Sequence, residues 1–293
     1  MNRLLTFLMI GWALPAFSQK TPIKNLKEAI LAKLATVEGT CAVAFKDLQT
    51  NQTLFINEKE AFHAASTMKT PVMIEVYKQA KAGKFRMTDS IMVKNEFKSI
   101  VDGTPFSLDI HNDSADGMYK KIGQKMTIYD LTYQMIIVSS NLATNILIDL
   151  VDAQKANATM RELGAGDIQV LRGVEDDKAF KLNMNNSVTA YDLHLIFEKI
   201  AKKKAIDNTA SEAMIRILLD QKFNEIIPAQ LPKEVKVAHK TGSITGVQHD
   251  SGIVFLPDGR KYVIILLSKG LSKTKEGIDA LADVSGMIYD FVK

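Results

Sequence analysis

The chain has 293 residues, of which 46% are hydrophobic and 24% charged, with a formal net charge of +4 at pH 7. This balance is ordinary for a globular protein and excludes a largely disordered chain. The charge is too small to indicate a nucleic-acid partner. The single cysteine, Cys41, excludes an internal disulfide.

The first residues have the pattern of a secretory signal. Arg3 precedes a short apolar run, residues 4–14, and Ala16-Phe17-Ser18 places small residues at the cleavage positions. The apolar run is too short to span a bilayer. We therefore predict a signal peptide at residues 1–18 and an exported protein, periplasmic or secreted, with no membrane association after cleavage.

The pattern then changes twice along the chain. Apolar spacing over residues 23–35 predicts a helix, and residues 40–47 and 53–57 predict the strands of a hairpin. From Ser66 the spacing is helical, and residues 85–220 look mostly helical, interrupted by polar loops. After Pro232 strands are predicted again, followed by a closing helix. Their ranges are 235–239, 247–256 and 261–267 for the strands and 277–292 for the helix.

Strand-containing ends therefore flank a helical middle. For the two ends to share one sheet they must meet in space, which predicts an α/β (α+β) fold with an inserted all-α subdomain. We expect one monomeric catalytic domain at residues 19–293. Its α/β layer would comprise about 19–65 and 221–293, and its all-α layer about 66–220.

Ser66-Thr67-Met68-Lys69 is the first candidate for chemistry. Residues three apart share a helix face, so Lys69 can lie beside the Ser66 hydroxyl. A serine needs an adjacent base to act as a nucleophile, and a helix start offers free N–H groups to a developing oxyanion. The tetrapeptide alone is weak evidence, because serine and lysine meet at this spacing by chance.

Two further polar motifs follow. Ser139-Ser140-Asn141 lies between apolar stretches, where polar side chains can line a cleft. Lys240-Thr241-Gly242-Ser243 ends a predicted strand, where Lys240 adds a positive charge and glycine permits a close approach of ligand or backbone.

In this order the three motifs resemble the signature of class A serine β-lactamases and the related penicillin-binding proteins, an established motif set. The resemblance covers most of the chain, and the run from Ser139 to Asn145 is especially similar. It implies an antiparallel sheet flanked by N- and C-terminal helices, a hydrolase acting on small-molecule β-lactams, and no cofactor or metal.

The resemblance also implies a role for each matching residue. Ser66 would be acylated, with Lys69 as its neighbouring base, although the group that takes the Ser66 proton is left open. Ser139 would pass a proton to the departing ring nitrogen, and Asn141 would bind the substrate's amide side chain. The backbone N–H groups of Ser66 and Ser243 would form an oxyanion hole. The substrate carboxylate would be held by Lys240, Thr241 and Ser243.

Glu175 separates the functions that the resemblance allows. It follows Ser139 by 36 residues, the family's spacing for the glutamate that activates water for deacylation. The spacing favours hydrolysis over two alternatives: a D,D-peptidase or penicillin-binding protein that deacylates slowly, and a penicillin sensor that stays acylated. The alternative interpretation, a solvated acid within the charge run Glu175-Asp176-Asp177, ranks behind the catalytic one. Asn145 is expected to brace the loop after Arg172.

The sequence departs from the familiar class A pattern in the second motif and around Glu175. The usual Pro and Leu-Asn after the glutamate are missing, which removes the Asn expected to help position the water. Ser140 replaces the usual Asp, which affects local bracing. The interval between the first two motifs is longer, and we place the extra length in residues 95–123, near the cleft mouth.

A further departure concerns carboxylate binding. Ser251 stands where many members have an arginine, and Gln248 or His249 could substitute for it. The histidines lack metal-ligand spacing, which argues against a metallo-hydrolase. The absence of a G-x-S-x-G motif argues against an α/β-hydrolase esterase.

Overall fold

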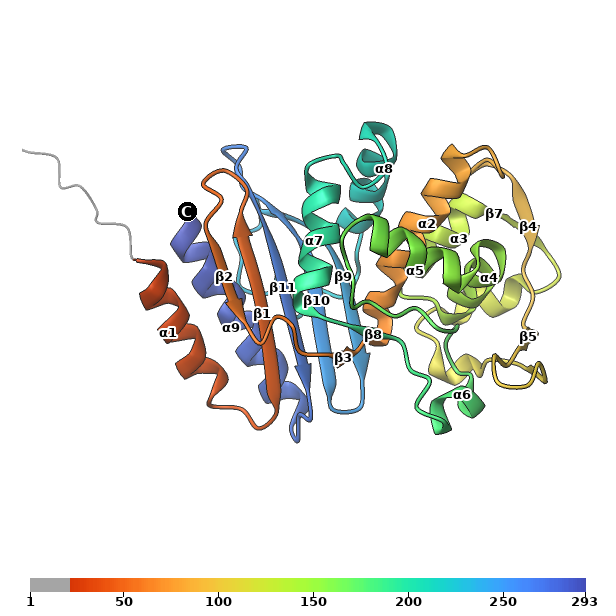
Figure 1. Cartoon of the computed structure of the whole chain (residues 1–293), viewed down its shortest axis with the longest axis horizontal. Coiled ribbons are helices and arrows are strands. Elements are labelled where there is room, and N and C mark those ends of the chain that lie inside the picture. Colours follow the sequence, from red (N-terminus) through yellow and green to blue (C-terminus); the bar gives the residue numbers. More distant parts are fainter. Residues whose placement is uncertain (1–21) are drawn as a thin grey trace, which may run out of the picture.

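A computed structural model describes residues 22–293 (Figure 1). The predicted signal peptide lies outside the described residues. Five strands form one antiparallel sheet in the order β2-β1-β11-β10-β9. Their bounds are β1 Thr40–Asp47, β2 Thr53–Ile56, β9 Lys236–Ile244, β10 Val247–Phe255 and β11 Lys261–Lys269.

Both faces of this sheet are buried, because the strand side chains alternate between two cores. Val43 and Phe45 of β1 pack under the terminal helices α1 (Ile23–Leu34) and α9 (Thr274–Val292). Ala42 and Ala44 face the larger core on the opposite side. Burial on both faces explains why these strands are almost continuously apolar.

The larger core is formed with the helices of the middle of the chain. Helices α7 and α8 cover this face of the sheet, and α2 runs through the helical region (Figure 1). Those helices are α2 Lys69–Lys81, α3 Ile128–Ile137, α4 Asn141–Val151, α5 Ala153–Glu162, α6 Asp177–Lys181, α7 Ala190–Ala201 and α8 Asn208–Leu219. The mixed fold confirms the predicted antiparallel sheet flanked by terminal helices. That residues 19–293 act as one catalytic domain stays a prediction.

The prediction of a mostly helical stretch from residue 85 is wrong for its first part. Residues 85–127 contain only short strands and 3₁₀ turns: β4 Ser90–Met92, β5 Phe97–Lys98, β6 Pro105–Phe106, β7 Lys125–Thr127, η2 Ile110–Asn112 and η3 Asp116–Lys121. The Asp109 and Asp113 side chains each accept a hydrogen bond from a backbone N–H two residues ahead. Such local bonds compete with the helix ladder.

The two remaining short strands, β3 (Phe62–His63) and β8 (Ser187–Val188), pair with each other beside the Ser66 turn. Strand β9 also differs from its prediction, since it continues to Ile244. The third motif therefore lies within the strand, where Ser243 pairs with Gln248 of β10.

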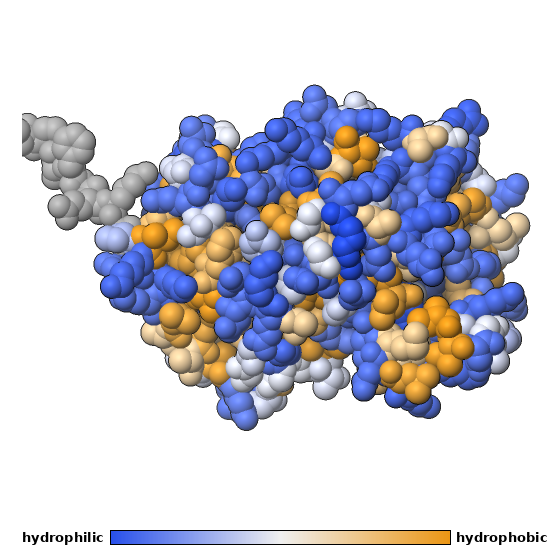
Figure 2. Space-filling view, in the orientation of Figure 1, coloured by the Kyte–Doolittle hydropathy of each residue, from blue (hydrophilic) through white to orange (hydrophobic). Residues whose placement is uncertain are grey.

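The face seen in Figure 2 is largely hydrophilic, with an apolar patch near α6. Exposed apolar side chains of this region include Phe180 and Leu182. Among residues 22–293, no helix combines the length and apolar character needed to cross a membrane.

The sheet core gives a first prediction. Ile264 is fully buried under the terminal helices. We expect Ile264→Ala to lower the free energy of unfolding by about 2–5 kcal/mol, because it removes buried methyl groups and leaves a cavity. Urea unfolding measures this loss. The control Leu31→Ala, at an exposed position of α1, should change stability by about 0.5 kcal/mol or less. Equal effects of the two substitutions would contradict the packing described here.

Candidate active site

Ser66 lies on a 3₁₀ turn, Ala65–Met68, that leads directly into α2. Ala65 has a φ of 43°, in the left-handed region that few residues other than glycine adopt. Strand β9 passes so close that a Cβ on Gly242 would lie 3.1 Å from Ser66 N. The glycine thus allows the third motif to pack against the turn that carries Ser66.

Lys69 is fully buried and donates three hydrogen bonds to the turn of the second motif. Its Nζ lies 2.6 Å from Ser139 O, 3.2 Å from Ser139 Oγ and 3.0 Å from Asn141 Oδ1. Among the described residues, no hydrogen bond joins Lys69 to the Ser66 hydroxyl. Burial lowers the pKa of Lys69 to about 7, although nearby carboxylates partly oppose the shift. An amine with this pKa can act as a base near neutral pH.

The Ser139 hydroxyl accepts hydrogen bonds from two buried lysines. Lys240 Nζ lies 3.0 Å from Ser139 Oγ and 2.8 Å from Thr241 O. Lys69 Nζ lies 3.2 Å from the same Ser139 Oγ. Burial, with repulsion from Lys69, holds the pKa of Lys240 well below its ordinary value. A hydroxyl has two acceptor lone pairs and one proton. The Ser139 proton is therefore free to point into the cleft.

A cavity of about 490 Å³ brings the three motifs together. At its strand side, Gln248 Nε2 donates to Ser243 Oγ at 2.8 Å. A second cavity of about 560 Å³ contains Glu175 and shares Ser66, Asn141 and Ser243 with the first. The predicted residues that line the first cavity are Ser66, Ser139, Asn141, Thr241 and Ser243.

The Glu175 carboxylate accepts two hydrogen bonds, one from the Asn141 side chain and one from the backbone of Asp109. Its Oε1 accepts from Asn141 Nδ2 at 3.0 Å, and its Oε2 accepts from Asp109 N at 3.1 Å. Burial raises the pKa of Glu175, while these two donors lower it. Asn141 is thus the side-chain amide that contacts the Glu175 carboxylate.

The loop that carries Glu175 is fixed from behind. Asn145 and Val174 exchange hydrogen bonds of 3.0 and 2.7 Å, which confirms the bracing role expected for Asn145. A Cβ on Gly173 would clash with Asn145 Oδ1, so a side chain at this position would displace the Asn145 amide. Buried Asp176 accepts from Ser99 Oγ and Ile100 N, both at 2.9 Å.

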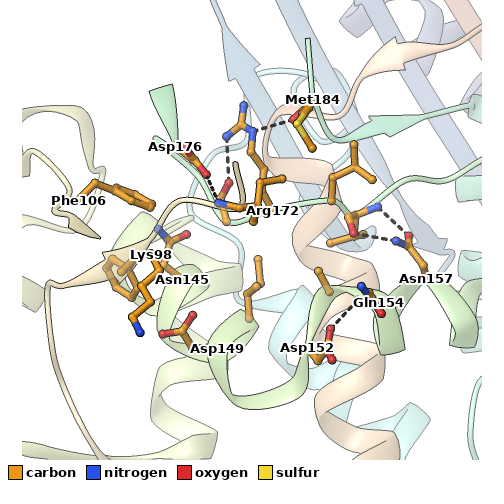
Figure 3. Close-up of a pocket in the computed structure, with 17 residues that line it drawn as sticks. Lys98, Phe106, Asn145, Asp149, Asp152, Gln154, Asn157, Arg172, Asp176 and Met184 are labelled. Atoms are coloured by element: carbon orange, nitrogen blue, oxygen red, sulfur yellow. Dashed lines mark hydrogen bonds between the residues drawn. The ribbon is translucent and has the colours of Figure 1, made fainter. Parts of the chain in front are cut away.

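Figure 3 shows Asn145, Arg172 and Asp176 around a cavity of about 600 Å³ behind this loop. The Arg172 guanidinium donates to Met184 O, Gly173 O and Asn185 Oδ1 at 3.0 Å each. These bonds tie the two ends of the loop together. The cavity contains none of the predicted site residues.

Asp109 and Asp113 are site residues that the sequence did not single out. Asp113 Oδ2 accepts from Leu142 N at 2.9 Å and from Ser140 Oγ at 3.3 Å. Both aspartates belong to the segment 95–123, which lies at the cleft as expected. The sequence did contain a signal for them: Ser140 stands where the family usually has Asp, so a carboxylate from another segment could have been expected at this turn.

The expected arginine position is occupied by Ser251, which pairs with Lys240 across the sheet. Its buried Oγ has no hydrogen-bond partner among the described residues. His249 is engaged with backbone on both sides of its ring, at Gln248 O and His63 O. Of the two suggested substitutes, only Gln248 presents its polar group beside Ser243. Across residues 22–293, no cluster of His, Cys, Asp and Glu could hold a metal ion.

A sequence model of the beta-lactamase enzyme family matches residues 24–292. The extended-spectrum beta-lactamase PER-1 of Pseudomonas aeruginosa is 24% identical over 310 aligned positions, which cover 98% of this chain and 92% of PER-1. A solved beta-lactamase from Sphaerobacter thermophilus is 26% identical, with a TM-score of 0.76 over 92% of this chain and 97% of that one. The structure of PBP-A is 24% identical, with a TM-score of 0.78 and the same coverage. This chain belongs to the beta-lactamase enzyme family, hydrolases that act on β-lactams, as a divergent class A-like serine member.

Proposed function

We propose that this protein hydrolyses β-lactam antibiotics in two steps, through a covalent acyl-enzyme on Ser66. The observation that supports this most is the chain of hydrogen bonds from Lys69 through Ser139 to Lys240, in which Ser139 lines one cavity together with Ser66. We further propose export to the periplasm or the medium, and a monomeric state.

In the acylation step, Ser66 Oγ attacks the lactam carbonyl carbon as Lys69 takes its proton. The N–H groups of Ser66 and Ser243 stabilise the oxyanion. The lactam C–N bond then breaks as Ser139 donates its proton to the departing nitrogen, and Lys69 passes the proton that it took from Ser66 to Ser139 Oγ, 3.2 Å away. The two lysines on Ser139 Oγ support this direction of transfer, because they leave the hydroxyl proton free to face the substrate.

Substrate binding uses the cavity floor on β9. Lys240, with the hydroxyls of Thr241 and Ser243, holds the substrate carboxylate. Gln248 takes part of the role of the missing arginine through its amide. Asn141 binds the amide side chain of the substrate.

In the deacylation step, Glu175 removes a proton from water, and the resulting hydroxide attacks the ester carbonyl. The bond between the acyl carbon and Ser66 Oγ then breaks, and the proton held by Glu175 returns to Ser66 Oγ. The position of Glu175 across the shared cavity from Ser66 supports this role. One observation favours the alternative, a D,D-peptidase-like enzyme that deacylates slowly: both carboxylate oxygens of Glu175 are already engaged by donors. The likeness to PBP-A fits the same alternative.

The central experiment combines turnover of a chromogenic cephalosporin with intact mass measurement. We expect sustained hydrolysis by the wild-type protein, and neither adduct nor turnover with Ser66→Ala. A stoichiometric burst with a lasting mass increase would identify the slowly deacylating alternative. Hydrolysis retained by Ser66→Ala would disprove the acyl-enzyme mechanism.

Glu175→Gln should separate the two steps. The amide cannot accept the water proton, so we expect normal acylation, an adduct that persists, and kcat lower by about 10²–10⁴. Rapid-quench mass spectrometry measures both steps. The control is Asp177→Asn, an exposed position two residues away, which should turn over like the wild type. Wild-type turnover by Glu175→Gln would refute the assigned role.

The pH dependence of acylation tests Lys69. Its pKa of about 7 means that the amine is protonated below pH 7 and neutral above it. If Lys69 takes the Ser66 proton, the acylation rate constant should rise with pH through an acid limb near pH 7. A rate constant that stays flat from pH 5.5 to 8 would exclude Lys69 as the base.

A further inference from the structure

The N-terminus of α4 carries a carboxylate that comes from outside the three motifs. Asp113 Oδ2 accepts the N–H of Leu142 at 2.9 Å and the hydroxyl of Ser140 at 3.3 Å. Ser140 is fully buried and caps the same helix by accepting from Ala143 N at 3.2 Å. An anion is favourable there, because the first N–H groups of a helix lack partners within it.

The segment around Asp113 is itself fixed to the helical region. Asp113 Oδ1 accepts from Ala115 N at 3.0 Å, and Ala115 is buried in the larger core together with Met118. One residue earlier, Asn112 O accepts from Asn141 Nδ2 at 3.1 Å. Two consecutive residues of this segment therefore hold the turn of the second motif.

That turn needs to be held. Ser139 has a φ of 58°, in the left-handed region that costs a non-glycine residue conformational energy. In this conformation both Ser139 oxygens lie toward Lys69, at 2.6 Å and 3.2 Å from its Nζ. A neighbouring group must offset the cost.

We propose that Asp113 is the positioning residue of the second motif: reaching in from the segment between the first two motifs, its carboxylate holds the Ser139-Ser140-Asn141 turn so that both lysines reach Ser139. Asp113 supplies this carboxylate because Ser140, which stands where the family usually has Asp, has only a hydroxyl. The proposal rests on the proposed acylation of Ser66. Asp113 contacts the turn and none of the reacting atoms, so its effect is indirect.

The charge of Asp113 gives the proposal a distinctive readout. The charged groups that act on the Lys69 amine are Asp113 and Glu175, which favour its protonated form, and Lys240, which repels it. Removal of the Asp113 charge therefore lowers the pKa of Lys69. The acid limb of acylation should then move to lower pH, whereas a merely structural loss would leave it in place.

The experiment measures the second-order acylation rate constant with a chromogenic cephalosporin by stopped flow, from pH 5 to 9. The variants are Asp113→Ala, Asp113→Asn and the double variant Asp113→Ala/Ser140→Asp. Asp116→Ala, an exposed aspartate of the same segment, is the matched control. Thermal unfolding by circular dichroism checks that each variant is folded, and the near-isosteric Asp113→Asn keeps the test valid if Asp113→Ala does not fold.

We expect Asp113→Ala to lower acylation by about 10- to 100-fold, because a small displacement of a reacting group has an effect of this size. Asp113→Asn should shift the acid limb to lower pH. The double variant should recover both the acylation rate constant and the pH at which the acid limb lies, since it returns a carboxylate to the same end of α4. Wild-type rates in Asp113→Ala and Asp113→Asn, or no recovery in the double variant, would overturn the proposal. No acylation in the wild type would instead refute the proposed function, so the two failures are distinguishable.

Discussion

The site depends on two lysine side chains that are completely buried beside one serine hydroxyl. Lys69 and Lys240 both donate to Ser139 Oγ and lie close enough to repel each other. Burial of two like charges this close is expensive, so their pKa values fall and at least one amine is readily neutral. The fold thereby makes a base from a side chain that is ordinarily protonated.

Carboxylates near each lysine limit the free-energy cost of burying the two amines. Asp113 and Glu175 act on Lys69, and Asp250 of β10 acts on Lys240. Asp250 is itself buried and is held by His239, whose Nδ1 lies 2.8 Å from Asp250 Oδ1. The balance between burial and these anions sets the protonation of the pair. Substitution of one of these carboxylates is therefore expected to change the pKa of the neighbouring lysine.

The architecture explains how groups distant in sequence meet at this point. Both ends of the chain build the sheet, and β9 brings Lys240 against the Ser66 turn because Gly242 has no side chain. The helical region supplies Ser139 between α3 and α4. The segment 95–123 then connects the second motif with the loop of Glu175, since Asp109 and Asp113 contact one each.

The sequence by itself determined the terminal helices, the strands of the main sheet and the family. Apolar periodicity predicted the terminal helices and the strands, and the motif residues Ser66, Ser139 and Lys240 meet as their order and types indicated. The helices and strands are local features, because they follow from side-chain spacing within a single element, whereas the meeting of the motifs was implied by the family resemblance.

Only the tertiary structure decided which groups surround the motifs. Residues 85–127 show no periodicity that distinguishes short strands from helix, and their path depends on side-chain to backbone bonds such as that of Asp109. The contacts from Asp113 to Ser140 and from Asn141 to Glu175 join residues 27 and 34 positions apart. Such pairings, and the burial that lowers the pKa of Lys69, arise from the packing of separate segments, which no local pattern of residues encodes.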